Sequence, residues 1–289
     1  MREFDETTIT AAVLERVSGA QDARLRQISE AVVRHLHALV REIEPTEEEW
    51  GQAIRFLTET GHLCSDIRQE FILLSDTLGV SMLVDAINHR LPQGATETTV
   101  FGPFYVPPPA FESGDDIRGD LTGYPMHVSG VVKSARGDVL ADAVVDVWHA
   151  DEHGFYDLQK LHQGAAYGGR GRFRTDGAGR FQFWTARPAA YPIPDDGTVG
   201  RMLKAQGRHP YRPEHIHFMI TAPGHRKLVT HIFAAGDQYL DSDVVFGVKA
   251  SLVDTYQAHH GGAAPDGRAM SGEWFSLSRE FRLAPTREA

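Results

Sequence analysis

The most informative stretch of this sequence is Tyr211-Arg212-Pro213-Glu214-His215-Ile216-His217-Phe218-Met219-Ile220. Side chains alternate between the two faces of a β-strand, so His215 and His217 point to one face and the apolar residues that follow each of them point to the other. The apolar face can enter a core, and two neutral imidazoles on the opposite face suit a metal ion. The stretch predicts a core strand that carries two metal ligands. The alternative is a pair of partly exposed surface histidines.

The residue types alone leave open what completes such a metal site. Cys64 is the only cysteine, which excludes a thiolate-rich zinc site. A carboxylate would complete a facial triad for ferrous iron, and aspartate and glutamate are plentiful. A tyrosine phenolate is the other hard anionic ligand, but it needs a strongly Lewis-acidic ion because a phenol has a pKa of about 10. Spacing does not choose among the eight tyrosines.

Short β-type runs separated by turn residues continue on both sides of this stretch. They cover residues 127–133, 143–148, 180–185, 215–221 and 227–233, with Gly-containing turns such as Arg136-Gly137-Asp138 between them. Many short strands with few helices predict a mainly β fold, a sandwich or a barrel. Residues 100–289 are therefore the predicted β domain.

Residues 1–99 are predicted to be helical, because glycine and proline are sparse there and apolar residues recur at three- and four-residue steps. One stripe consists of Leu25, Ile28, Val32, Leu36, Leu39 and Ile43. Thr46 and Glu49 can form a capping box at the start of the next helix. Further helices are expected over residues 65–76 and 80–88, which makes about four.

Composition narrows the class of protein. The net charge of -10 argues against a nucleic-acid or anionic-membrane partner, because both carry negative charge. No apolar stretch approaches the ~20 residues of a spanning helix. The N-terminal residues lack the apolar run of a signal peptide, and one cysteine cannot form an internal disulfide. These features predict a cytoplasmic globular protein.

Several segments together resemble one family, the intradiol ring-cleavage dioxygenases. In chain order they are residues 100–105 (VFGPFY), 128–132 (VSGVV), 145–150 (VDVWHA), 154–156 (GFY), 191–194 (YPIP), 212–218 (RPEHIHF) and 236–240 (GDQYL). The resemblance runs from about residue 20 to residue 283. It implies a β-sandwich with one non-haem Fe(3+) per subunit, and it carries the ligand roles over to Tyr156, Tyr191, His215 and His217.

The resemblance also implies an activity, the cleavage of an aromatic ring by O2 between two hydroxyl-bearing carbons. Two phenolates and two neutral imidazoles would favour ferric over ferrous iron. Tyr191 matches the axial ligand that gives way to substrate, and it lies in a proline-rich segment that we expect to be irregular. Arg212 matches the residue that stabilises negative charge on the substrate ring. We expect His231 to bond an oxygen at the metal; the alternative is a satisfied core histidine.

Residues 69–85 and 228–233 look most like the hydroxyquinol 1,2-dioxygenases. The expected substrate is then benzene-1,2,4-triol, converted to 3-hydroxy-cis,cis-muconate or maleylacetate in aromatic-compound degradation. We expect Leu73 and Asp76 to reach the pocket, where Asp76 would accept a hydrogen bond from the third hydroxyl; the alternative is a helix-end or solvent-facing Asp76. The other expected substrate-binding residues are Val100, Phe101, Gly102, Pro103, Phe104, Ile193, Pro194, Arg212 and Val245.

Other interpretations remain open beside this one. Catechol or a chlorocatechol is the alternative substrate, giving cis,cis-muconates. The family pairs two subunits through its helical N-terminal part and binds a phospholipid at that interface, so the resemblance implies a homodimer; a helical cap on a monomer is the alternative. A ferrous or zinc enzyme with an acidic third ligand, and a non-catalytic β-sandwich binding module, are the competing functions.

Overall fold

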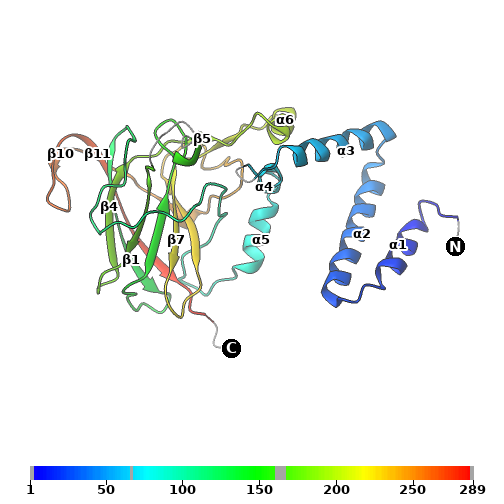
Figure 1. Ribbon diagram of the computed structural model, residues 1–289, viewed down its shortest axis with the longest axis horizontal. Coiled ribbons are helices and arrows are strands. Elements are labelled where there is room, and N and C mark those ends of the chain that lie inside the picture. The colour runs from blue at the N-terminus through cyan, green and yellow to red at the C-terminus, as the bar shows by residue number, and fades with distance from the viewer. Residues whose placement is uncertain (1–2, 66–67, 160–166, 287–289) are drawn as a thin grey trace. The chain divides into compact units, whose positions relative to one another are not determined.

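The computed structural model describes residues 3–65, 68–159 and 167–286 (Figure 1). By contacts the chain divides into two compact units, Met1–Glu59 and Thr60–Ala289. The helices are α1 (Ile9–Val17), α2 (Ala23–Ile43), α3 (Glu47–His62), α4 (Glu70–Thr77), α5 (Val80–Asn88) and α6 (Thr198–Ala205). Within the described ranges, no helix combines the length and the apolar character that crossing a bilayer requires.

The first unit contains α1, α2 and α3 as far as Glu59. The Asp22 side chain accepts a hydrogen bond from the backbone N–H of Leu25 (2.6 Å) at the start of α2. The predicted capping box precedes α3, with Glu49 N donating to Thr46 Oγ1 (3.2 Å) and Thr46 N donating to Glu49 Oε2 (2.8 Å). The apolar stripe of α2 is confirmed as one helix, and its six side chains are 45–58% exposed.

Three helices differ from the sequence prediction. The helix expected over residues 65–76 begins only at Glu70, and residues 66–67 lie outside the described ranges. Before it, Ser65 N donates to Arg68 O (2.7 Å) and Arg68 N donates to Ser65 Oγ (3.2 Å), so these two residues are not hydrogen-bonded in a helical pattern. The short helices α1 and α6 were not predicted.

The second unit contains a β-sandwich, as predicted. One sheet has the order β10-β11-β1-β4 and the other the order β3-β2-β7-β8-β9, and β5 and β6 form a separate two-stranded pair. The strands are β1 (Pro125–Ser134), β2 (Val144–Trp148), β3 (Arg170–Arg174), β4 (Arg180–Ala186), β5 (Tyr191–Pro192), β6 (Tyr211–Arg212), β7 (His215–Thr221), β8 (Leu228–Ala234), β9 (Val253–Asp254), β10 (Gln257–Ala263) and β11 (Ala269–Leu283).

The main core lies between the two sheets. It combines Val128 of β1 and Phe183 of β4 with Val145 of β2 and Phe218 of β7, all with at most 1% of their surface exposed. Strand β7 lies between β2 and β8, and its register places His217 opposite Trp148 on one side and opposite His231 on the other. The alternation predicted for β7 is confirmed, because Ile216, Phe218 and Ile220 enter the core and the two histidines lie on the other face.

Candidate metal centre

Four side chains from three separate parts of the sequence meet on the outer face of the β2–β7–β8 sheet. The Tyr156 hydroxyl lies 2.8 Å from His217 Nε2 and 3.2 Å from the Tyr191 hydroxyl. His215 Nε2 lies 3.2 Å from His217 Nε2. All four side chains are buried. The arrangement offers two oxygen and two nitrogen donors at one point.

The two tyrosines are placed by turns and by a very short strand. Gly154 has φ +83°, and a Cβ there would lie 2.4 Å from Tyr191 Cβ, so only glycine permits this approach. The Tyr156 ring stacks on Phe104 with 4.4 Å between the ring centres. Tyr191 was expected in irregular structure, but it begins β5 and pairs directly with Arg212 of β6. That pairing brings an arginine beside the second tyrosine.

The two histidines of β7 are oriented by their neighbours. His215 Nδ1 donates to Pro213 O (2.6 Å), which leaves the lone pair of Nε2 facing the cluster. The His217 ring stacks on Trp148 with 4.6 Å between the ring centres and 18° between the planes. Gly102 packs on the same imidazole, since a Cβ there would lie 3.1 Å from His217 Cε1. Both rings are therefore held in one orientation before any ligand binds.

Burial sets the protonation of the cluster. It lowers the pKa of His215, His217 and His231 well below the ordinary 6.5, and neighbouring positive charge adds to the effect, so all three imidazoles are neutral. Burial also raises the pKa of Tyr156 well above 10.0, with the charge of Tyr191 acting in the same direction. A phenolate at Tyr156 therefore requires a strongly positive ion beside it.

A third histidine joins this group. Donor atoms of His215, His217 and His231 lie within 4.8 Å of one another, and in the described ranges no carboxylate or thiol belongs to that group. This weighs against a facial triad with an acidic ligand. His231 is completely buried, and its Nε2 has no hydrogen-bond partner among the described residues. A satisfied core histidine would have bonded both nitrogens, so the polar edge of His231 is available to a bound molecule.

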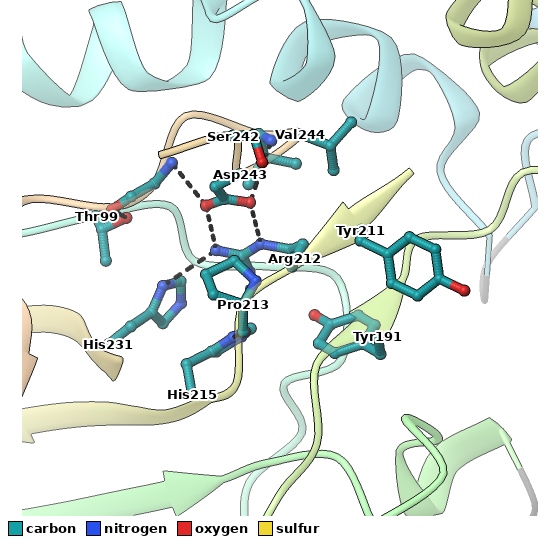
Figure 2. A network of polar contacts seen from close by, with 12 residues as sticks. Thr99, Tyr191, Tyr211, Arg212, Pro213, His215, His231, Ser242, Asp243 and Val244 are labelled. Carbon is teal, nitrogen blue, oxygen red and sulfur yellow. Dashed lines mark hydrogen bonds and ion pairs between the residues drawn. The ribbon is translucent and has the colours of Figure 1, made fainter. Parts of the chain in front are cut away.

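Arg212 is buried beside the histidines and pairs with Asp243 (Figure 2). Its Nη1 lies 3.2 Å from His215 Nε2, and its Nη2 lies 3.4 Å from His231 Nδ1. Burial lowers the pKa of Arg212, but the charge and hydrogen bonds of Asp243, together with the charges of Tyr191 and Tyr156, more than offset this and raise it. The sequence prediction missed Asp243. One feature of the sequence could have indicated it: Asp243 directly precedes two valines, and the second of these, Val245, was already expected at the pocket.

The predicted pocket residues divide into two groups. Leu73, Val100, Ile193 and Val245 gather in one buried apolar cluster. Gly102 and Phe104 contact the His217 and Tyr156 rings, whereas Phe101 and Pro103 are exposed and Pro194 is half-buried. Asp76 is only 5% exposed, so the solvent-facing alternative is wrong. Burial raises the pKa of Asp76, opposed by a hydrogen bond from Ser81 and by the charge of Arg212.

A further buried histidine beside the centre makes stability depend on pH. Burial lowers the pKa of His149 to about 4, although its Nδ1 donates to Ala150 O (2.7 Å). An unfolded histidine takes up a proton near its ordinary pKa of 6.5, whereas folded His149 resists protonation until about 4. The free energy of unfolding is therefore unaffected by His149 above pH 6.5 and falls as the pH is lowered towards 4, by about 2 kcal/mol between pH 7 and pH 5.

The substitution His149→Gln tests this effect. Between pH 7 and pH 5 the free energy of unfolding in urea should change less for His149→Gln than for the wild type; an equal change would contradict this.

Fold and site together define a β-sandwich protein with a buried cluster of two phenols and three imidazoles. Models of two protein families match the chain, "Dioxygenase" over residues 100–278 and "Catechol dioxygenase N terminus" over residues 22–96. The chain belongs to the intradiol ring-cleavage dioxygenase family.

Three relatives show how far the similarity extends. The chain is 51% identical to a 6-chlorohydroxyquinol 1,2-dioxygenase of Cupriavidus pinatubonensis, over 99% of this chain and 100% of that one. It is 48% identical to a hydroxyquinol 1,2-dioxygenase of Nocardioides simplex, over 97% and 96%. The crystal structure of hydroxyquinol 1,2-dioxygenase from Pseudomonas putida DLL-E4 matches with a TM-score of 0.90 and 46% identity, over 97% of this chain and 99% of that one.

Enzymes of this family depend on non-haem iron, and the geometry of the cluster fits such an ion. Ligand atoms bonded to one ion at about 2.0–2.1 Å lie about 3 Å from each other. The separations from Tyr191 through Tyr156 and His217 to His215 are 3.2, 2.8 and 3.2 Å.

Proposed function

We propose that this protein is a hydroxyquinol 1,2-dioxygenase. It opens the ring of benzene-1,2,4-triol with O2 between the two adjacent hydroxyl-bearing carbons and yields 3-hydroxy-cis,cis-muconate, which tautomerises to maleylacetate. The observation that carries the proposal is the convergence of two phenols and two neutral imidazoles beside a buried arginine. Relatives with this activity in their names, at 48% identity over nearly the whole chain, support the choice of substrate.

One ferric ion per chain would be held by Tyr156, Tyr191, His215 and His217. Two phenolates and two neutral imidazoles offset two of the three charges of Fe(III), which favours the ferric state. When bound, the iron supplies Lewis acidity and a template for the diol and O2. The same ion meets the need of buried Tyr156 for a compensating positive charge.

Tyr191 and Arg212 act on the incoming triol. The Tyr191 hydroxyl oxygen, on the two-residue strand β5, is the site that accepts a proton from a substrate hydroxyl. The Arg212 guanidinium donates to the substrate oxygen on which negative charge accumulates, and its burial strengthens this interaction.

His231 complements Arg212 as a neutral donor. Arg212 Nη2 faces His231 Nδ1 at 3.4 Å, so the ring proton belongs on Nε2. Nε2 is buried and unpartnered, which suits it to donate a hydrogen bond to an oxygen in the site. This role depends on geometry alone and requires no change of charge on His231.

Asp76 is the residue that we expect to recognise the third hydroxyl. The side chain is buried near the positive charge of Arg212, in the helix that also contributes Leu73 to the apolar cluster. Asp76→Ala should lower the ratio of kcat/KM for the triol to kcat/KM for catechol by about 10- to 100-fold, the usual effect of losing a charged hydrogen bond. Catechol serves as the internal control, since it lacks the third hydroxyl. An unchanged ratio would show that Asp76 does not recognise it.

The test of the function is a substrate panel in which oxygen uptake is followed with the purified iron-loaded protein. We expect the triol to be consumed with one O2 per ring and with a higher kcat/KM than catechol or a chlorocatechol. Preference for catechol would select the alternative substrate. No oxygen uptake with any diol would contradict the proposed function.

The helical part supports a homodimer. We propose residues 1–99 as the dimerisation domain and residues 100–289 as the catalytic domain. The stripe on α2 exposes six large apolar side chains in the single chain, more than an isolated surface helix usually presents. A phospholipid against such a surface, as the family implies, belongs to the same proposal. The lone Cys64 fits the reducing cytoplasm expected from the sequence.

A further inference from the structure

Asp243 holds one whole edge of the Arg212 guanidinium. Arg212 Nε donates to Asp243 Oδ1 (3.1 Å) and Nη2 donates to Oδ2 (3.2 Å), the two parallel contacts visible in Figure 2. Both side chains are buried, with 3% and 5% of their surface exposed. A bidentate pair of this kind fixes the plane of the guanidinium as well as its position.

Asp243 is itself fixed by the loop that follows it. Its Oδ2 accepts from the backbone N–H of Gly247 (2.9 Å), and the Thr99 hydroxyl donates to Gly247 O (3.0 Å). A Cβ at Gly247 would lie 2.9 Å from Arg212 Nη2 and 3.1 Å from Asp243 Oδ2, so the absence of a side chain lets the loop close on the ion pair. The carboxylate has no room to turn.

The edge that Asp243 leaves free points into the metal centre. Nη1 is directed at His215 Nε2 (3.2 Å), and the second N–H of Nη2 is directed at His231 Nδ1 (3.4 Å). If His215 Nε2 binds iron, its lone pair is no longer an acceptor, and the Nη1 hydrogens are free for a substrate oxygen. The direction in which Arg212 donates is therefore decided by Asp243.

We propose that Asp243 is a positioning residue for ring cleavage. It holds the guanidinium so that Nη1 faces the substrate oxygen, and through Nη2 it keeps the His231 proton on Nε2. Asp243 does not contact the substrate itself. The inference rests on the proposed function, because the substrate oxygen is the one that the triol brings to the centre.

The test compares Asp243→Asn with Asp241→Asn, the same change at an exposed position of the same loop. Asp243→Asn should lower kcat for the triol by about 10- to 100-fold, as expected for loss of a charge-assisted pair. Iron content and the visible spectrum of the substrate-free protein should stay as in the wild type, since no proposed ligand is changed. The spectral shift on anaerobic addition of the triol should be altered. Asp241→Asn should match the wild type in all of these measurements.

A double-mutant cycle separates positioning from a general structural role. In the Arg212→Gln background, adding Asp243→Asn should cause no further fall in kcat, because its effect passes through Arg212. The double variant should melt at a higher temperature than Arg212→Gln alone, because it removes a buried unpaired carboxylate. The proposal would be overturned if Asp243→Asn lowered kcat in the Arg212→Gln background by the same factor as in the wild type. Equal kcat values for Asp243→Asn and Asp241→Asn would also overturn it.

A second variant, Gly247→Ala, and the activity of the wild type complete the test of the positioning role. If Asp243→Asn does not fold, Gly247→Ala displaces the same ion pair without removing either charge and should lower kcat in the same direction; wild-type kcat there would also overturn the proposal. A wild-type protein that fails to cleave the triol would instead contradict the proposed function. A wild type that cleaves it, with unaffected Asp243 and Gly247 variants, contradicts only the positioning role.

Discussion

His217→Ala should give a folded protein that retains no iron and cleaves no diol. His217 Nε2 lies between the Tyr156 hydroxyl at 2.8 Å and His215 Nε2 at 3.2 Å, so its loss removes the donor at the middle of the cluster. Metal ions supply several kcal/mol of transition-state stabilisation, and the fall in kcat should therefore exceed about 1,000-fold. Metal analysis and oxygen uptake on the same preparation measure both effects.

The matched control for this change is His260→Ala. His260 is exposed on β10, in the other sheet of the sandwich, so the same substitution there should leave iron content and kcat unchanged. Circular dichroism of His217→Ala should match the wild type, because the apolar residues of β7 that enter the core are intact. A His217→Ala protein with full iron content and activity would remove His217 from the ligand set.

Arg212→Lys should retain iron and lose most of the rate. Lysine keeps the positive charge but has a single donor atom, so it cannot hold both oxygens of Asp243 and also present an N–H to the substrate. By analogy with the loss of one oxyanion donor, kcat should fall by about 100- to 1,000-fold. Steady-state kinetics with the triol, together with metal analysis, check this prediction.

Arg174→Lys is the control for this second change, since Arg174 forms an exposed ion pair with Asp142. Pairs of this kind contribute at most about 1 kcal/mol to stability, and kcat should not change. If Arg212→Lys kept nearly the wild-type kcat, charge alone would suffice and the direction of the guanidinium would be irrelevant. That result would also weaken the role assigned to Asp243.

Local patterns predicted those parts of the fold that depend on local physics. The alternation over residues 215–221 predicted β7, and the stripe and capping box predicted α2 and the start of α3. The long strand β11 was missed, although Phe275, Leu277, Phe281 and Leu283 alternate with polar residues and enter the core. Its strand conformation depends on parallel pairing with β1, as between Val128 and Leu277, and no window of sequence contains that partner.

Local patterns likewise predicted only some residues of the candidate site. Alternation alone placed His215 and His217 on one face, but no spacing rule selects tyrosines 35 residues apart, and the resemblance to a family chose Tyr156 and Tyr191. The sequence did not indicate Asp243, because its partner Arg212 lies 31 residues earlier. The two side chains are brought together by the loop that closes at Gly247. The proposed ligand roles and the division of the chain at residue 99 stay predictions.

The visible spectrum of the purified protein, measured together with its iron content, tests the ferric tyrosinate centre most directly. We expect one iron per chain and a broad tyrosinate-to-iron charge-transfer band, seen as a wine-red colour, which changes when the triol is added without O2. Tyr156→Phe should alter that band more than any change outside the cluster. A colourless, iron-free protein that stays inactive after reconstitution with iron would contradict the account.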